Sequence, residues 1–214
     1  MAKEGWDLVL PAILLALIFW FLSWLYKCVP TLFLAIIFSL LVLLLVFFFR
    51  DPKRIVPNGE DIILAPADGH IDEIERLPLV DFLEDAGLRI SIFMSIFDVH
   101  INRLPISGEV KYVKHKPGKF LPAFKKNSSE ENAQTEIGIE NPNLRVILRQ
   151  IVGFTARRIV CRLKVGDKIK MGHRFGMIKF GSRVELLLPH SVEIKVKLGD
   201  KVKAGETIIG ILKR

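Results

Sequence analysis

The chain has 214 residues, of which 50% are hydrophobic and 25% charged, and its formal net charge is +8. This length allows one compact domain with a small addition, but not two domains of ordinary size. So many apolar residues exclude an intrinsically disordered chain, and their coexistence with so many charges indicates that the two kinds are separated along the sequence. The two cysteines, Cys28 and Cys161, offer neither a disulfide framework nor the spacing of a metal site.

Residues 1–50 contain two apolar runs, Leu8–Tyr26 and Cys28–Phe49, in which no charged residue occurs. Each run is long enough to cross a bilayer as a helix, which takes about 20 residues. Pro30 opens the second run, where proline suits the first turn of a helix and discourages one continuous helix through the junction. A cleaved signal peptide is disfavoured, because the first run is long and a second apolar run follows at once. The sequence therefore predicts a transmembrane α-helical hairpin that anchors the chain.

The cations that flank the hairpin predict its orientation, because Lys and Arg favour the cytoplasmic side of a membrane. Lys3 precedes the first run and Arg50, Lys53 and Arg54 follow the second, whereas the turn between them holds Lys27 alone. We therefore expect a cell-membrane protein in which both ends of the hairpin, and the domain that follows it, lie on the cytoplasmic side.

Residues 51–214 are expected to form a mainly β domain. Short runs rich in Val, Ile and Phe are broken by Gly, Pro and Asp, which is the pattern of an all-β sandwich or barrel. A short helix over 79–87 and a long polar loop over 118–143 are expected to interrupt the strands. Most of the excess positive charge lies in this domain, and attraction to anionic lipid head groups explains it. Nucleic acid is not an expected partner, because no groove-reading motif occurs.

A repeat marks the last third of the chain. Val165–Gly172 (VGDKIKMG) recurs as Leu198–Gly205 (LGDKVKAG), and an apolar run follows each copy. Such self-similarity predicts two equivalent turn-and-strand units in one system of sheets. The pattern resembles the hammerhead of biotinyl and lipoyl domains, which gives the expected fold of the β domain. A carrier function is not expected, because the tripeptide around a modifiable lysine is missing.

Gly181 and Ser182, between the two copies, permit a particular chemistry. A Gly-Ser step in a tight bend lets the serine hydroxyl approach the preceding carbonyl, because glycine has no Cβ and adopts unusual backbone angles. Attack moves the acyl group from nitrogen to oxygen, elimination of the ester leaves dehydroalanine, and hydrolysis of its imine form leaves a pyruvoyl group and ammonia. Because Gly-Ser is also common in ordinary turns, the dipeptide alone leaves both interpretations open.

Further motifs occur from about residue 50 to the C-terminus. They are Ala65–Gly69 (APADG), Phe93–Pro105 (FMSIFDVHINRLP), Pro117–Phe120 (PGKF), Ser129–Asn132 (SEEN), Gly153–Arg162 (GFTARRIVCR) and Arg174–Val184 (RFGMIKFGSRV). Together they resemble the short form of the pyruvoyl-dependent phosphatidylserine decarboxylase proenzymes. The resemblance implies self-cleavage between Gly181 and Ser182 into chains 1–181 and 182–214, which remain together as an α/β pair. It also implies a pyruvoyl group derived from Ser182, with no metal.

The resemblance assigns roles to three residues, and the chain departs from the family pattern at a fourth, Arg103. The ketone derived from Ser182 condenses with the substrate amine and accepts the electrons released as CO2 leaves. His100 matches the histidine that returns a proton to the substrate, and Asp68 matches an aspartate that helps to activate the serine for cleavage. The longer form of the family has a second histidine three residues after the first, whereas this chain has Arg103 there. Arg103 is therefore either a contact for the phosphate or carboxylate of the substrate or part of a structural salt bridge.

The predicted function is membrane-anchored decarboxylation of phosphatidylserine to phosphatidylethanolamine and CO2 in phospholipid biosynthesis. Two alternatives stay open: the same reaction on another serine-headed lipid such as archaetidylserine, and a non-catalytic, membrane-tethered hammerhead module that binds a partner. A higher homo-oligomer also stays open. The apolar stretch Phe120–Phe124, followed by Lys125 and Lys126, either dips into the membrane interface or covers the core.

Overall fold

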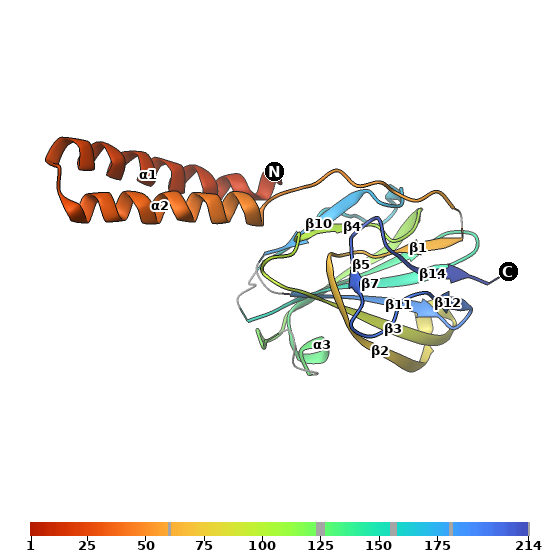
Figure 1. Ribbon diagram of the computed structural model, residues 1–214. Coiled ribbons are helices and arrows are strands. Elements are labelled where there is room, and N and C mark those ends of the chain that lie inside the picture. The colour runs from red at the N-terminus through yellow and green to blue at the C-terminus, as the bar shows by residue number, and fades with distance from the viewer. Residues whose placement is uncertain (60, 123–126, 155–157, 180–181, 214) are drawn as a thin grey trace. The chain divides into compact units, whose positions relative to one another are not determined.

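The computed structural model describes residues 1–59, 61–122, 127–154, 158–179 and 182–213. The chain forms two compact units, Met1–Pro52 and Lys53–Arg214 (Figure 1). Each is described by itself below.

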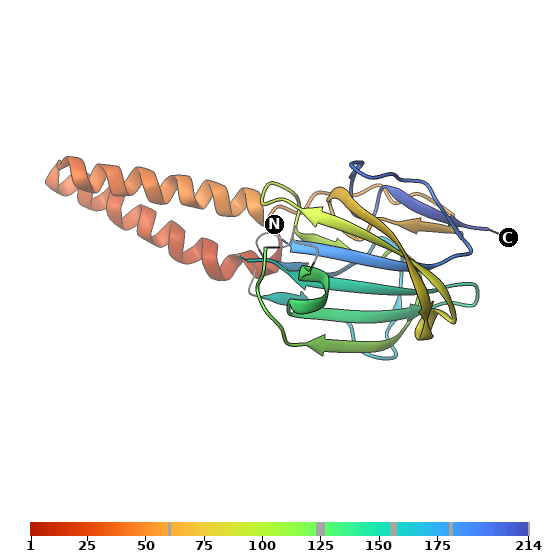
Figure 2. The same cartoon turned by 90° about the horizontal axis from the view of Figure 1, so that it is seen from below.

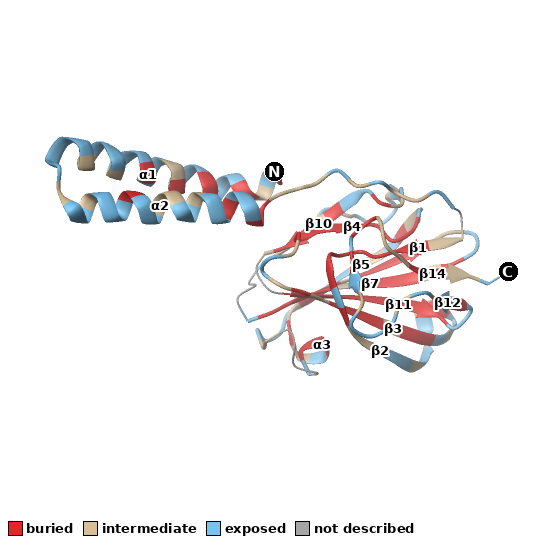
Figure 3. Cartoon of the chain, viewed as in Figure 1, coloured by how far each residue is buried: buried red, intermediate tan, exposed pale blue. Residues whose placement is uncertain are grey.

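The N-terminal unit is an antiparallel pair of helices, α1 (Trp6–Tyr26) and α2 (Val29–Phe48), preceded by the 3-10 helix η1 (Lys3–Gly5) (Figure 1). Lys27 ends α1 in the left-handed conformation, with φ of 50°, and Pro30 lies in the first turn of α2. Both helices are long and apolar enough to cross a membrane, and most of their side chains are exposed (Figure 3). The predicted helical hairpin is confirmed.

The second unit is mainly β, as predicted, with two short helical turns among its strands. Their bounds are β1 (Ile62–Leu64), β2 (Gly69–Val80), η2 (Asp81–Leu83), β3 (Asp85–Met94), β4 (Ile101–Arg103), β5 (Gly108–Lys116), α3 (Ser128–Glu131), β6 (Gln134–Glu140), β7 (Arg145–Val152), β8 (Ile159–Cys161), β9 (Lys168–Ile169), β10 (Arg174–Ile178), β11 (Ser182–Pro189), β12 (Val192–Ile194), β13 (Lys201–Val202) and β14 (Ile208–Leu212).

These strands form one large curled sheet and two small ones (Figures 1 and 2). The large sheet has eight strands in the order β13-β2-β3-β11-β7-β6-β5-β9, and the small sheets have the orders β1-β14-β12 and β4-β10-β8. Alternate residues of the large sheet, such as Ile90 and Ile92 of β3, share one hydrophobic core with Ile63, Phe175 and Ile209 of the small sheets. Because side chains alternate between the faces of a strand, the other face of the large sheet is free to carry polar residues.

The strand pairings repeat in two equivalent halves, one formed by β1–β3 with β11–β14 and the other by β4–β10. In each half the first strand pairs with the seventh (β1 with β14, and β4 with β10). The second strand pairs with the sixth (β2 with β13, and β5 with β9), and the fifth pairs with the seventh (β12 with β14, and β8 with β10). The second strand also pairs with the third and the third with the fourth, and β11 pairs with β7 to join the halves. The two copies of the sequence repeat contain β9 and β13, which are the two outer strands of the large sheet. The second half is therefore inserted into the first, and β11 is the strand where the first half resumes.

Two local predictions were wrong. The helix expected over 79–87 is instead the end of β2, the single turn η2 and the start of β3, because the two strands pair with each other up to this turn. The loop expected over 118–143 contains α3 and β6, and β6 pairs with β5 and β7. Burial of Ile137 and Ile139 against the core stabilises this strand despite its polar neighbours.

Candidate active site

Ser182 is the first residue of β11, one of the two central strands of the large sheet. It pairs with Met94 at the end of β3 and with Val152 at the end of β7. Its side chain is fully buried, on the same face of β11 as the core residue Val184. Pairing on both sides therefore fixes Ser182 independently of the bond that precedes it. Gly181, the other predicted cleavage residue, lies outside the described residues.

Two buried amide side chains, neither of them predicted, are linked to Ser182 through Met94. Ser182 Oγ is 3.4 Å from Met94 Sδ, and Asn102 Nδ2 approaches the same sulfur at 3.9 Å. Gln150 Nε2 donates to Asn102 Oδ1 at 2.8 Å, and all these side chains are fully buried. We call Ser182, Met94, Asn102 and Gln150 the serine pocket. One feature of the sequence could have revealed this pocket: Gln150 is a polar residue at a position of the apolar strand β7 that faces the core.

His100 is fully buried and directly precedes β4. Its Nδ1 lies 3.0 Å from the backbone oxygen of Asp98, in a turn where the Ser95 amide donates to Asp98 Oδ2 at 2.8 Å. A carbonyl oxygen only accepts, so Nδ1 carries a proton and Nε2 is the nitrogen that can take up or return one. Asn102 of the serine pocket follows His100 by two residues. The turn and β4 thus hold an oriented imidazole near the pocket.

Asp68 lies just before β2, in an ion pair that is largely shielded from water. Arg54 Nη2 donates to both oxygens of Asp68, at 2.9 and 2.7 Å, and the Ala204 amide donates to Oδ1 at 2.8 Å. Burial raises the pKa of Asp68, while the bonds from Ala204 and Arg54 oppose this rise. Arg54 also lies 3.4 Å from Glu206. The described bonds of Asp68 therefore go to Arg54 and to the second repeat rather than to His100 or Ser182.

Arg103, in the position where the longer family form has histidine, lies between the two repeats. Its Nη1 donates to the Gly172 carbonyl at 3.0 Å, and its backbone amide donates to Pro66 O at 2.9 Å. Its side chain also passes so close to Gly205 that a Cβ added there would lie 2.8 Å from Arg103 Cδ. Gly205 has a φ of +73°, so both its backbone and its surroundings require glycine. These contacts brace the two repeat turns against each other.

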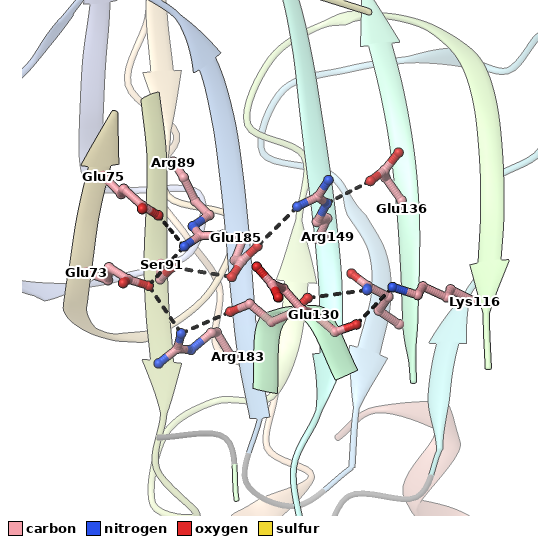
Figure 4. A network of polar contacts seen from close by, with 12 residues as sticks. Glu73, Glu75, Arg89, Ser91, Lys116, Glu130, Glu136, Arg149, Arg183 and Glu185 are labelled. Atoms are coloured by element: carbon pink, nitrogen blue, oxygen red, sulfur yellow. Dashed lines mark hydrogen bonds and ion pairs between the residues drawn. The ribbon is translucent and has the colours of Figure 1, made fainter. Parts of the chain in front are cut away.

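Arg183 follows Ser182 and points to the opposite face of β11. It is 3% exposed, forms an ion pair with Asp72, and lies 3.5 Å from Glu73, both on β2 (Figure 4 shows the contact with Glu73). Its Nη1 also donates to Ser129 Oγ of α3 at 3.1 Å. Burial raises the pKa of Asp72, and the charge of Arg183 opposes that rise. Arg183 thus ties the start of β11 to two other elements.

Glu185, two residues farther along β11, is fully buried in the same network (Figure 4). Arg149 lies 3.7 Å from it and donates a shorter bond of 2.7 Å to Glu136, and the charges of Arg89 and Arg183 also act on it. Ser91 Oγ approaches Glu185 at 3.5 Å. Burial is the main influence on the carboxyl group and raises the pKa of Glu185. Among the described residues, no group of three or more His, Cys, Asp or Glu is placed to hold a metal ion.

Comparison with known proteins gives consistent matches. The family model described as phosphatidylserine decarboxylase matches residues 41–210. Proteins named phosphatidylserine decarboxylase proenzyme are similar to this chain over most of its length. The one from Carboxydothermus hydrogenoformans is 49% identical over 181 residues, which are 84% of this chain and 85% of the relative. The one from Geotalea uraniireducens is 40% identical over 213 residues, 99% of this chain and 96% of the relative.

Proposed function

The chain belongs to the phosphatidylserine decarboxylase family, and we propose that it performs this decarboxylation with a pyruvoyl group made from its own Ser182. It is a carboxy-lyase that converts phosphatidylserine to phosphatidylethanolamine and CO2. The position of Ser182 carries the proposal for the site, because the residue is buried at the start of a central strand and is linked through Met94 to two buried amides.

The serine pocket fits a group derived from Ser182. When formed, the pyruvoyl group supplies a ketone that condenses with the substrate amine and accepts the electron pair released with CO2. In the same pocket Asn102 Nδ2 contacts Met94 Sδ, and Gln150 Nε2 donates to Asn102 Oδ1. We propose that these amide N–H groups stabilise negative charge that develops on oxygen during the reaction. The core residues around the pocket exclude water from the reacting atoms.

For self-cleavage we propose attack by Ser182 Oγ on the carbonyl of residue 181. Loss of ammonia after elimination and hydrolysis then leaves the new group at the start of chain 182–214. Asp68 supports this step through the turn at Ala204, since its carboxylate is already engaged by Arg54 and the Ala204 amide. We propose a similar bracing role for Arg103, which its bond with Gly172 supports.

His100 is proposed to return a proton to the former α-carbon after CO2 has left. Its Nδ1 is committed to the Asp98 carbonyl, which fixes the tautomer and directs Nε2 to proton transfer. The two-residue distance from Asn102 supports a place beside the serine pocket.

The two products of cleavage, residues 1–181 and 182–214, are proposed to stay together. The shorter one begins with β11, which pairs with β3 and β7, and it also contains β13 and β14, which pair with β2 and β1. A piece this short cannot bury a core alone, so separation would expose strand edges and core residues of both chains. The helical hairpin supports membrane attachment, and the flanking cations support a cytoplasmic catalytic domain.

Intact-mass analysis of the purified, denatured protein tests this proposal. We expect two species, one ending at Gly181 and one starting at position 182 that is lighter than a serine-started peptide by the mass of ammonia. Ser182→Ala should give one uncut chain without decarboxylase activity. An active Ser182→Ala protein would contradict the mechanism, and an uncut but active wild-type chain would contradict self-processing.

A further inference from the structure

The exposed aromatic side chains of the β domain gather at one end of the large sheet. The large apolar residues there are Ile96, Phe97, Phe120 and Phe154, with exposed fractions of 51%, 65%, 42% and 69%. They include every exposed phenylalanine among the described residues of Lys53–Arg214. We propose that these four residues, which we call the apolar rim, insert into the surface of the lipid bilayer and form a second membrane contact besides the hairpin. The inference rests on the proposed site at Ser182.

Strand pairing places the apolar rim around Ser182. Ile96 and Phe97 follow Met94, and Phe154 follows Val152 by two residues, and these are the two residues that pair with Ser182. The loops that follow β3 and β7 therefore both begin next to Ser182.

The third loop is tied to the same place by a buried asparagine. Asn132 Nδ2 donates to Val152 O at 2.7 Å and to Leu121 O at 2.8 Å, and the Leu121 amide donates back to Asn132 Oδ1 at 2.9 Å. Phe120, the neighbour of Leu121, is thereby held next to the end of β7. Loops from three parts of the sequence thus present their apolar side chains at the Ser182 end of the sheet.

The bilayer is the occupant that fits this surface. The substrate of the family is a diacyl lipid whose chains stay in the membrane, because exposing them to water is strongly unfavourable. Ser182 is fully buried in the domain, so the lipid head group reaches it only if this end of the sheet approaches the bilayer. The cations Lys119, Arg158 and Lys179 lie within a few residues of the rim or of Ser182, which suits an anionic surface. Aromatic side chains beside cations are typical of protein segments that lie in the membrane interface.

The far end of the sheet provides a matched control. Leu79 is 69% exposed and lies ten residues along β2 from Gly69, roughly 30 Å away from the Ser182 end at the rise of a β-strand. Val165, 65% exposed, precedes β9, which pairs with the first residues of β5 at the same far end. If the apolar rim inserts into the bilayer, its residues should contact lipid, whereas Leu79 and Val165 should not.

A lipid-depth measurement on the full chain in vesicles tests insertion. In a Cys28→Ser/Cys161→Ala background, Ile96→Cys and the control Leu79→Cys are labelled with an environment-sensitive fluorophore. The protein is placed in phosphatidylcholine vesicles with phosphatidylglycerol and spin-labelled lipid. We expect blue-shifted emission and strong quenching at position 96, with little of either at position 79. Equal quenching at the two positions would overturn the inference. A blue shift without lipid quenching would overturn it in favour of a second protein copy as the occupant.

A kinetic comparison links insertion to the reaction. The variant Phe97→Ser/Phe154→Ser is compared with Leu79→Ser/Val165→Ser on bilayer phosphatidylserine and on a short-chain phosphatidylserine dissolved as monomers. We expect the ratio of bilayer to monomer kcat/KM to fall about fivefold or more for the rim variant only, because two large apolar contacts with lipid are lost. An unchanged ratio would overturn the apolar rim while leaving the proposed function intact. Loss of self-cleavage and of turnover on both substrates in the wild type would instead contradict the proposed function.

Discussion

Asp68 and Ser107 occupy equivalent places in the two halves of the β domain and accept equivalent hydrogen bonds. Asp68 Oδ1 accepts the Ala204 amide at 2.8 Å, and Ser107 Oγ accepts the Met171 amide at 3.0 Å. Each acceptor directly precedes the second strand of its half, and each donor lies at the same position of a repeat copy. The ion pair with Arg54 is what sets Asp68 apart. Asp68 thus combines a turn-holding role, for which a hydroxyl suffices in the other half, with a buried charge.

The variant Asp68→Ser separates these two properties. We expect it to keep the bond to Ala204 and still to cleave itself, more slowly than the wild type, whereas Asp68→Val loses the bond and most of the cleavage. Asp68→Ser leaves the buried Arg54 with Glu206, at 3.4 Å, as its described ion-pair partner, so we expect this variant to lose thermal stability and Arg54→Gln/Asp68→Ser to recover part of it. Cleavage is followed by intact mass over time, and stability by Tm. If Arg54→Gln/Asp68→Ser recovers its Tm but never cleaves, the carboxylate acts chemically and the positioning role is wrong.

Glu185→Gln should stabilise the protein at neutral and alkaline pH. Burial raises the pKa of Glu185, so the folded state binds its proton more tightly than the unfolded state does. The stability that this group contributes is therefore present below its unfolded pKa and is lost as pH rises through the folded value. Glutamine keeps the neutral form at every pH, so Tm should rise relative to wild type at pH 8 and match it near pH 4. Each kcal/mol gained raises Tm by about 2–4 °C in a domain of this size.

The control for this experiment lies in the same network. Glu136→Gln removes a partly exposed carboxylate that accepts a 2.7 Å bond from Arg149, and we expect it to lower Tm at pH 8. A lower Tm for Glu185→Gln at pH 8 would mean that Arg149 and its neighbours outweigh the cost of burying the charge.

The parts of the fold that the sequence predicts are those with local causes. The hairpin follows from two uncharged runs joined at Pro30, and the repeat turns follow from matching glycines and apolar positions. β6 was missed because its apolar residues, Ile137 and Ile139, are few, and its stability depends on pairing with β5 and β7. The helix expected over 79–87 was wrong for the same reason, since strand pairing there overrides local preference.

The site was predictable only in part. Ser182 and His100 belong to motifs that can be recognised in the sequence, and the role of either residue stays a prediction. Asn102 and Gln150 come from strands of different sheets, and only tertiary structure brings them to Ser182. The equivalence of Asp68 and Ser107 likewise becomes visible only in the structure, because one half of the β domain is inserted into the other along the chain.

His100→Ala should slow decarboxylation even in enzyme molecules that have already cleaved themselves. Loss of a general acid typically slows a reaction by about 10²- to 10⁴-fold, so we expect turnover to fall within this range. His115→Gln is the control, because His115 Nδ1 also lies 3.0 Å from an oxygen, Thr135 Oγ1, but its strand β5 is separated by β6 from β7, the strand that carries Gln150 of the serine pocket. Turnover is measured per molecule of cleaved enzyme, so that slower processing does not count as slower chemistry. Equal turnover of the two variants would contradict a role for His100 in proton transfer.

Arg183→Gln should misplace the reactive group without unfolding the domain. After cleavage Arg183 is the second residue of the shorter chain, and its described partners, Asp72, Glu73 and Ser129, all belong to the longer one. A displacement of about 1 Å at the reacting atoms costs up to about 10²-fold in rate, so we expect kcat to fall at least tenfold while KM changes less.

Two further variants make this result specific to position. Arg183→Lys keeps a charge opposite Asp72 but lacks the fork that also reaches Ser129, so it should restore part of kcat. Arg89→Gln, on the same face of the large sheet, removes a mostly buried arginine that pairs with Glu73 and Glu75 from within the longer chain, so we expect Tm to fall while kcat stays close to that of wild type. Similar losses of kcat in Arg89→Gln and Arg183→Gln would assign the effect to the charge network as a whole rather than to the residue that follows Ser182.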